Sequence, residues 1–290
     1  MKLFEGKKGI IMGLVNDHSL AWAISSFLIE QGAQLGFSHL PDKEGRDRME
    51  RRVRKLVDPL GSKLVFPCDV SKDEDIKKFF GAVGETYGKV DFLVHSIAFA
   101  PLDDIRCPTL EASRAGFQMA MDISVYSLIA VARAASQVLN DGGSILTLTY
   151  FGGERVVAGY NLMGVCKAAL DATVRYLAYD FGPRGIRVNA LSAGPVRTLA
   201  ASAVGDFDDM MKLYSAVAPL GRNVTMEEVA KSSAFLLSSM STATTGEILH
   251  VDCGYNIMGS PGRAIEKLGM DAAAAKPRVG GTVPEAGAAH

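Results

Sequence analysis

The chain has 290 residues, of which 48% are hydrophobic, so it can bury a large core. Its 31 basic and 32 acidic residues leave a formal net charge of -1, which argues against nucleic acid or an anionic membrane as a partner. The four cysteines lack C-x-x-C spacing, so we expect no metal site, a reducing compartment, and thiols buried as small apolar groups. With no signal-peptide core and no apolar run long enough to span a membrane, the sequence predicts a cytoplasmic enzyme.

Short apolar runs alternate with longer amphipathic segments along the whole chain. Strands separated by helices pair in parallel through crossovers, so this order predicts an α/β fold: a single Rossmann-type, doubly wound parallel sheet of about seven strands with helices on both faces. The predicted strands are Gly9–Met12, Gln34–Ser38, Lys63–Pro67, Phe92–His95, Ser144–Leu148, Arg187–Leu191 and Glu247–Val251. The predicted helices are Leu20–Gln31, Asp42–Val57, Asp73–Tyr87, Asp122–Leu139, Asn161–Phe181 and Met226–Ser239.

Ligands of doubly wound sheets bind at the carboxyl ends of the strands, and the first predicted strand is followed by a candidate phosphate site. Gly13 can make a tight turn, and Ser19, followed by Leu20, stands where a helix N-cap could bond a pyrophosphate oxygen. The segment is not a G-x-G-x-x-G fingerprint. Taken alone, the segment is better explained by an ordinary glycine turn with a serine cap, and the later motifs favour the phosphate site.

The third and fourth predicted strands also end in candidate cofactor residues. Asp69 can hydrogen-bond an adenine amino group while Val70 packs against the ring; the alternative is that Asp69 caps the next helix, because Ser71–Glu74 resembles a capping box. After the fourth strand, Ser96 and Ile97 lie in a run of small residues that lets a nicotinamide ribose approach the backbone. His95, at the end of this apolar strand, is expected to be a core histidine with satisfied nitrogens.

The sixth predicted strand leads into a Gly-Pro turn. The backbone of Val196 and the hydroxyl of Thr198, just beyond that turn, can hold a carboxamide and a phosphate. The following stretch at about 199–219 is rich in Ala, Met and Leu, which suits a mobile lid over an apolar substrate. A surface helix packed on the sheet is the alternative.

Tyr160 and Lys167 are two helical turns apart and share one face of a predicted helix. Met163 stands four residues before the lysine, where an ordinary short-chain dehydrogenase carries its catalytic tyrosine. The phenol is therefore displaced by about one turn along the helix. Tyr150 precedes Tyr160 by ten residues, just past the fifth predicted strand.

Taken together and in this order, the motifs resemble the bacterial NADH-dependent enoyl-acyl-carrier-protein reductases, a divergent branch of the short-chain dehydrogenase/reductases. The resemblance covers about residues 1–258, which we expect to form one domain including the lid; residues 259–290 are expected to be an extension that is at least partly flexible. The motifs that carry it are Gly13 to Ala21, Cys68-Asp69-Val70, Ser96 to Pro101, Asp122 to Ser127, Tyr150, Tyr160 to Lys167, and Arg187 to Ser202.

The resemblance implies that hydride from NADH reduces the trans-2 double bond of an enoyl thioester, as in the fatty-acid elongation cycle. It implies that Tyr160 donates to the thioester oxygen, that Lys167 holds the nicotinamide ribose hydroxyls, that Tyr150 shapes the acyl pocket or relays a proton, and that Ala100 and Tyr160 contact the substrate. No basic residue immediately follows the second predicted strand to meet a 2′-phosphate, which favours NADH over NADPH.

Two other functions remain open at this point: a short-chain dehydrogenase acting on a ketone or alcohol, and a dinucleotide-binding protein without turnover. Reduction of a ketone needs a proton donor beside the reacting carbonyl, and Met163 cannot supply one.

The resemblance also implies a carrier-protein-bound substrate and a homotetramer with helix Asp122–Leu139 in an interface. Burial of that apolar helix within one subunit is the alternative. Acidic residues in the lid (Asp206, Asp208 and Asp209) argue against docking of an acidic carrier protein at this edge.

Overall fold

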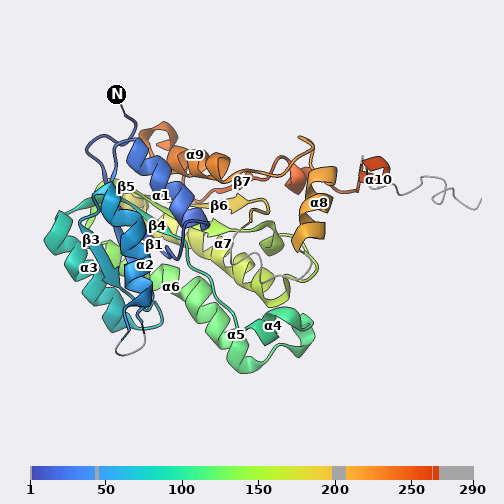
Figure 1. Cartoon of the computed structure of the whole chain (residues 1–290), viewed down its shortest axis with the longest axis horizontal. Coiled ribbons are helices and arrows are strands. Elements are labelled where there is room, and N and C mark those ends of the chain that lie inside the picture. The colour runs from blue at the N-terminus through green and yellow to red at the C-terminus, as the bar shows by residue number, and fades with distance from the viewer. Residues whose placement is uncertain (1, 43–45, 198–206, 263, 268–290) are drawn as a thin grey trace, which may run out of the picture.

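The computed structural model describes residues 2–42, 46–197, 207–262 and 264–267. Its centre is a seven-stranded, entirely parallel sheet with strand order β3-β2-β1-β4-β5-β6-β7, which confirms the predicted Rossmann-type architecture (Figure 1). The strands are β1 (Lys8–Met12), β2 (Gln34–His39), β3 (Leu64–Pro67), β4 (Val90–His95), β5 (Leu139–Thr149), β6 (Arg187–Ala193) and β7 (Ile248–Val251).

Helices cover both faces of the sheet because every central strand buries apolar side chains on both sides. In β1, Ile10 and Met12 join the core beneath α3, α6 and α7, whereas Ile11 joins the core beneath α1, α2 and α9. The helices are α1 (Leu20–Glu30), α2 (Arg48–Val57), α3 (Asp73–Tyr87), α4 (Leu102–Arg106), α5 (Arg114–Met121), α6 (Ser127–Ala135), α7 (Asn161–Phe181), α8 (Phe207–Val217), α9 (Met226–Leu237) and α10 (Ala264–Lys267). Short 3₁₀ turns lie at Asp58–Leu60, Thr109–Glu111, Phe151–Gly153 (η4), Gly182–Arg184, Ser239–Ser241 and Tyr255–Ile257 (η8).

The strand order reverses its direction between β1 and β4, and this switch point is where open α/β sheets bind ligands. Met12 pairs with His95 at the carboxyl ends of the two strands, and the Ser96 amide donates to the Met12 carbonyl at 3.0 Å. Gly13 has φ +94, and a Cβ there would overlap the Ser96 carbonyl. Only glycine therefore lets the two loops pass this closely.

Two predicted boundaries around the fifth strand are wrong. Strand β5 begins at Leu139 rather than Ser144. The pairing with β4 shifts register between Val90 and Phe92, so the strand continues through a polar Gly-Gly segment whose composition is typical of a turn. The preceding helix runs from Arg114 to Ala135 instead of Asp122–Leu139: Ser113 caps it by accepting from the Gly116 amide, and a π-helical turn at Asp122–Tyr126 joins α5 to α6.

The beginning of α2 was also predicted wrongly. The helix starts at Arg48 rather than Asp42, and the Asp42 carboxylate instead accepts from the Met49 and Glu50 amides. These bonds lower the pKa of Asp42, because they stabilise its charged form at the positive end of the helix. The intervening residues 43–45 lie outside the described residues.

The continuous helix Arg114–Ala135 is long and apolar enough to cross a membrane by length and composition, with a mean hydropathy of 1.4. The expectation that the sequence holds no such run was wrong on this measure. Half of the scored window is buried inside the protein, however, as in the core helix of a globular domain.

Helices α4 and α10 had not been predicted as separate elements, whereas α8 lies in the 199–219 stretch for which a surface helix was the alternative to a lid. Helix α10 lies within the proposed C-terminal extension and contacts α8. The domain boundary at residue 258 stays a prediction, and the Ala/Gly/Pro-rich tail at 268–290 lies outside the described residues.

Candidate active site

Tyr160 and Lys167 lie at the start of α7, as their spacing predicts. Tyr160 is the N-cap residue, and Lys167 is buried two turns later with only 6% of its surface exposed. The lysine ammonium donates to the Leu148 carbonyl of β5 at 2.8 Å. Gly153 in η4 packs against the Lys167 backbone, where a Cβ would lie 2.8 Å from the Lys167 carbonyl carbon. Glycine there lets the Tyr150 segment lie directly against α7.

An asparagine that sequence reasoning missed fixes this end of α7. Asn161 has φ +40, a left-handed conformation that asparagine tolerates better than most residues. Its side-chain amide donates to the carbonyls of Ile105 and Cys107, at 2.8 and 2.9 Å. These bonds anchor the start of the helix to the end of α4, and so hold Tyr160 in place.

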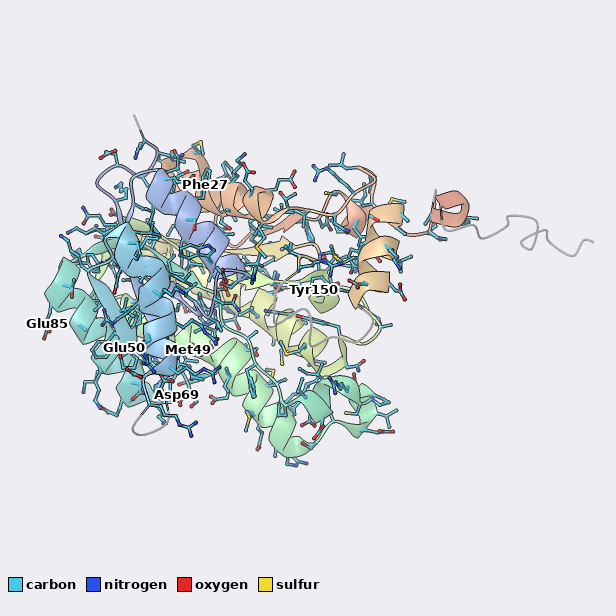
Figure 2. All side chains as sticks on the ribbon, in the orientation of Figure 1. Phe27, Met49, Glu50, Asp69, Glu85 and Tyr150 are labelled. Carbon is cyan, nitrogen blue, oxygen red and sulfur yellow. The ribbon has the colours of Figure 1, made fainter. Side chains whose placement is uncertain are left out.

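The two predicted tyrosines are in direct contact. The rings of Tyr150 and Tyr160 meet edge to face with their centroids 4.7 Å apart. The hydroxyl of Tyr150 is hydrogen-bonded to the hydroxyl of Tyr214 on α8, and the Tyr214 ring stacks on Tyr255 of η8 at 3.8 Å. Figure 2 shows Tyr150 on the side of the molecule that carries α8. No periodicity in the sequence singles out Tyr214 or Tyr255.

Burial keeps both phenols neutral. It raises the pKa of Tyr150 to about 12 and raises that of Tyr160 well above its ordinary value, with the neighbouring Tyr150 adding to the effect. The same cause acts in the opposite direction on the lysine: burial lowers the pKa of Lys167 to about 8, partly offset by the Asp171 carboxylate. At neutral pH both phenols are therefore protonated, and Lys167 carries a positive charge.

The lysine fits a ligand that offers several hydroxyl groups. An ammonium has three hydrogens to donate, and among the described residues the carbonyl of Leu148 takes one of them. A buried charged group with unused donors is costly unless a ligand completes its hydrogen bonds, and the two hydroxyls of a ribose would do so.

At the end of β1, Ser19 is the N-cap of α1, as predicted. Its hydroxyl accepts from the Trp22 amide at 3.1 Å and donates to the Asn16 carbonyl at 2.8 Å. The first turn of α1, which begins at Leu20, carries no acidic residue. The positive end of this helix is thus available to an anion next to Gly13.

The alternative that Asp69 caps α3 is wrong. Its carboxylate accepts from the amide and hydroxyl of Ser71, at 3.1 and 2.7 Å, whereas Lys72 occupies the N-cap position without a side-chain cap. Asp69 therefore shapes the turn after β3, beside the buried Val70. Figure 2 shows Asp69 far from Tyr150, so the two could contact opposite ends of an extended dinucleotide.

The loop after β4 is tied to the π-helical turn. The hydroxyl of Ser124 accepts from the Phe99 amide and donates to the Phe99 carbonyl, both at 2.9 Å. These two hydrogen bonds come from a serine whose role sequence reasoning missed. They hold the loop that carries the half-buried Ser96 and Ile97 and the buried Ala100 along the crevice.

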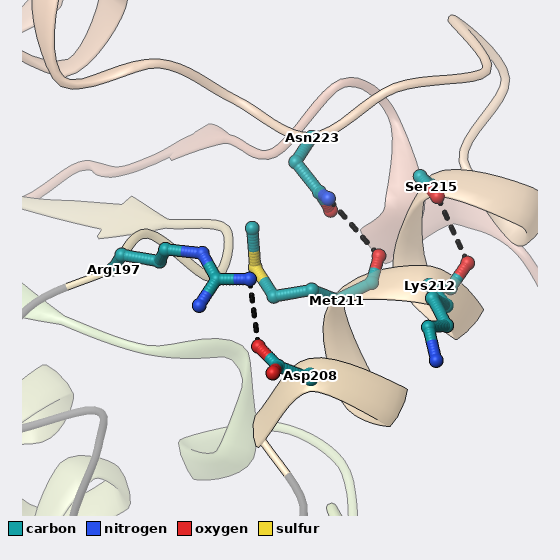
Figure 3. A pocket seen from close by; sticks show the side chains of 6 residues that line it. All are labelled: Arg197, Asp208, Met211, Lys212, Ser215 and Asn223. Atoms are coloured by element: carbon teal, nitrogen blue, oxygen red, sulfur yellow. Dashed lines mark hydrogen bonds and ion pairs between the residues drawn. The ribbon is translucent and has the colours of Figure 1, made fainter.

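Beyond β6, Val196 is half-buried, whereas Thr198 and residues up to 206 lie outside the described residues. The described part of the proposed lid is α8, which forms a pocket of about 320 Å³ with the loops around it (Figure 3). Two lid acids are paired: Asp208 lies 2.6 Å from Arg197, and Asp209 lies 3.0 Å from Lys212. The lining residues are Arg197, Asp208, Met211, Lys212, Ser215 and Asn223.

His95 is a core histidine, as predicted. Its ring is fully buried, with Nδ1 3.1 Å from the Thr147 hydroxyl and Nε2 2.9 Å from the Ser127 hydroxyl. Burial lowers the pKa of His95 to about 3, so it is neutral at physiological pH.

The cysteines meet expectation only in part. All four are free, but Cys68 and Cys166 alone are buried, whereas Cys107 and Cys253 are half-buried. Within the described ranges, no three His, Cys, Asp or Glu side chains gather as a metal site would require.

A family model described as "Enoyl-(Acyl carrier protein) reductase" matches residues 13–256 of the chain. The chain belongs to the enoyl-acyl-carrier-protein reductase family. It is 50% identical over 257 residues to "Enoyl-[acyl-carrier-protein] reductase [NADH] 1" of Rhizobium meliloti, covering 89% of this chain and 93% of that relative.

Solved structures of enoyl-acyl-carrier-protein reductases share its architecture. An Anaplasma phagocytophilum enzyme crystallised with NAD matches with a TM-score of 0.84 and 45% identity, covering 89% of this chain and 97% of that one. A Bacillus cereus enzyme crystallised with NADP+ and indole naphthyridinone matches with a TM-score of 0.86 and 47% identity, covering 90% and 100%. The predicted family and fold are confirmed; the roles of individual residues stay predictions.

The buried His95 predicts a pH-dependent stability. The unfolded histidine has a pKa of about 6.5, so between that value and 3 the unfolded chain binds more protons and stability falls as the pH falls. We expect this residue to account for about 2 kcal/mol of the stability lost between pH 7 and pH 5. Urea unfolding of His95→Gln, which cannot take up that proton, should show a correspondingly smaller loss; an unchanged loss would contradict this origin.

Proposed function

We propose that this chain reduces the trans-2 double bond of enoyl thioesters with NADH, the activity that the sequence predicts and that its family confirms. The observation that carries the residue-level account is the placement of Tyr160 two turns before the buried Lys167 on α7, with the buried, nonpolar Met163 between them. Bound NADH supplies the hydride. The rest of the chemistry depends on the chain's own side chains.

The displaced phenol matches the electronic demand of enoyl reduction. Hydride adds to the β-carbon, the double-bond electrons shift, and negative charge collects on the thioester oxygen, which two carbon atoms separate from the β-carbon. A proton from solvent then completes the α-carbon. Tyr160 is the donor for that oxygen, and neutrality of its phenol at working pH keeps the hydrogen bond available. The Lys167 charge favours the same anion.

The residues that would hold NADH line the carboxyl edge of the sheet. The Gly13 turn and the α1 terminus beginning at Ser19 and Leu20 suit the pyrophosphate, Asp69 and Val70 the adenine, and Lys167 the nicotinamide ribose. Ser96, Ile97, Val196 and Thr198 complete the proposed set.

The start of α2 supports the preference for NADH. The Asp42 carboxylate occupies the helix N-terminus three residues after β2, where a 2′-phosphate would otherwise find amide donors. A second anion placed there would be repelled. The relative from Bacillus cereus was crystallised with NADP+, so the proposed preference of the present chain for NADH rests on the local charge at Asp42.

The central test is loss of 340 nm absorbance with NADH and crotonyl or longer enoyl thioesters, beside acetoacetyl thioesters and simple ketones. We expect enoyl turnover, and a fall in kcat of about 10²- to 10³-fold in Tyr160→Phe with NADH binding retained. Turnover of ketones alone would reject the proposal, as would cofactor binding without any turnover. Tyr87→Phe, which removes a buried hydroxyl that donates to the Leu35 carbonyl away from the site, is the matched control.

Delivery of the substrate by an acyl carrier protein is proposed from the name of the relatives. Carrier proteins of this kind are acidic, and the acids of α8 argued against docking there. Pairing of Asp208 with Arg197 and of Asp209 with Lys212 cancels much of that charge. The surface is therefore close to neutral rather than repulsive.

Removing the negative charges of Asp208 and Asp209 should free the basic side chains that are paired with them. In Asp208→Asn/Asp209→Asn, Arg197 and Lys212 become available to an acidic carrier. KM for enoyl-carrier substrate should fall several-fold at low salt and lose this gain at high salt, since exposed charges are screened. KM for enoyl-coenzyme A should change less. An equal effect on both substrates would argue against carrier docking at α8.

We also propose that the chain forms a homotetramer. Large apolar side chains are exposed on the continuous helix Arg114–Ala135 and on α7, which contact each other, and a surface of this kind suits association with a second copy of the chain. Within the described residues, they are Phe117 and Met119 on α5, Tyr126 in the π turn, and Val165, Tyr176 and Tyr179 on α7.

Sedimentation measures this assembly directly. We expect a tetramer at micromolar concentration, and dissociation toward smaller species in Tyr176→Glu/Tyr179→Glu, because a charge cannot be buried in an apolar interface without a partner. A monomer for the unsubstituted chain would reject the assembly.

We place the enzyme in the cytoplasm, as its four free cysteines support.

A further inference from the structure

Tyr150 reaches α8 through a single hydroxyl group. Among the hydrogen bonds of the described residues, its partner is the hydroxyl of Tyr214. Tyr214 is 4% exposed, whereas Tyr150 is half-buried at the edge of the site. A buried phenol needs a hydrogen-bond partner, so this contact determines where the Tyr150 oxygen lies.

The ring of Tyr214 lies on an aromatic platform formed by Tyr255 and the η8 turn, which leaves the ring little freedom to move. Its ring lies parallel to that of Tyr255, at 3.8 Å and an interplanar angle of 11°. Tyr255 begins η8, whose turn is closed by Asp252 accepting from the Gly254 and Asn256 amides at 2.9 and 2.8 Å. Phe151 packs edge-on against Tyr255 with centroids 5.9 Å apart.

The platform is also joined to the far end of α8. Gly254 has φ +86, and a Cβ there would lie 2.9 Å from the Pro219 ring, just beyond the helix. Helix α8 and η8 are therefore packed against each other both at Tyr214 and at Pro219. A continuous set of rings leads from Tyr255 through Tyr214 and Tyr150 to Tyr160.

Tyr214 hydrogen-bonds both Tyr150 and Tyr255, so its hydroxyl has an acceptor whichever way the bond to Tyr150 runs. Beside the larger effect of burial, the bond between Tyr150 and Tyr214 acts to raise the pKa of Tyr214 and to lower the pKa of Tyr150, as expected when Tyr214 donates and Tyr150 accepts. In that arrangement the more accessible Tyr150 keeps its own hydrogen for a ligand or water, and the nearly inaccessible Tyr214 hydrogen is satisfied.

We propose that Tyr214 is a positioning residue for the reductase: it donates to the Tyr150 hydroxyl, fixes that ring against Tyr160, and turns the Tyr150 hydrogen toward the reacting thioester. The inference rests on the proposed function, because it assigns Tyr150 a place beside the substrate. It also means that α8 contributes to the site through a hydrogen bond, in addition to covering it.

A double-mutant cycle tests this role. Tyr214→Phe keeps the stacked ring and removes the hydrogen bond, so kcat with an enoyl thioester should fall about 3- to 10-fold, with KM for NADH unchanged. In a Tyr150→Phe background the same substitution should cause no further loss. Equal losses in both backgrounds, or no loss in either, would overturn the inference.

Tyr87→Phe is the control for loss of a buried hydroxyl elsewhere. Tyr87 donates to the Leu35 carbonyl at 2.9 Å, so the substitution removes a comparable bond away from the site and should leave kcat unchanged. Wild-type turnover of the enoyl thioester is measured first. Its absence rejects the proposed function itself, whereas normal turnover with additive losses rejects only the role of Tyr214.

A fluorinated residue keeps the inference testable if Tyr214→Phe does not fold. With 3-fluorotyrosine at position 214, ring and hydroxyl remain, and kcat should stay within about twofold of the wild type because the hydrogen bond is kept. The fluorine resonance should shift when Tyr150 is replaced by Phe. An unchanged resonance would show that the two side chains do not interact in solution, and would overturn the inference.

Discussion

Burial of one ammonium group is the constraint on which the site depends. Lys167 lies against η4 and donates to the carbonyl of Leu148, and the Asp171 carboxylate offsets only part of the cost of burying its charge, so a ligand that accepts further hydrogen bonds stabilises it. Glycines at the contact allow α7 to approach that closely. The Asn161 amide then fixes the start of the helix, and with it the phenol two turns before the lysine.

That arrangement separates the stabilised oxygen from the carbon that receives hydride. A phenol one turn nearer to the lysine would serve a carbonyl that is itself reduced. At Tyr160 the donor instead suits an oxygen at the far end of a conjugated system. Met163 fills the vacated position with a buried, nonpolar side chain, which removes the proton donor for the competing reaction.

Much of this was predictable because it depends on local patterns. Alternating apolar runs predicted the parallel sheet, and helical spacing predicted that Tyr160 and Lys167 share a face. Helix starts were less predictable where the cap comes from a distance: Asp42 caps α2 from seven residues before its partner Met49. A polar Gly-Gly segment likewise concealed the first half of β5.

The unpredicted part of the site consists of contacts between residues far apart in the sequence. Ser124 holds the loop at Phe99, and Tyr214 meets Tyr150 across 64 positions. Nothing in the periodicity around either residue marks it, because its partner is brought near only by the folded sheet. Side chains of this kind need the three-dimensional structure to be found.

The central claim is that hydride goes to the carbon remote from the stabilised oxygen. Turnover of a trans-2-enoyl thioester with NADH carrying deuterium at the transferred position measures this directly, with the product analysed by mass spectrometry and NMR. The account predicts one deuterium at the β-carbon, a solvent-derived hydrogen at the α-carbon and an intact thioester. Deuterium at the carbonyl carbon, in an aldehyde or alcohol product, would contradict it.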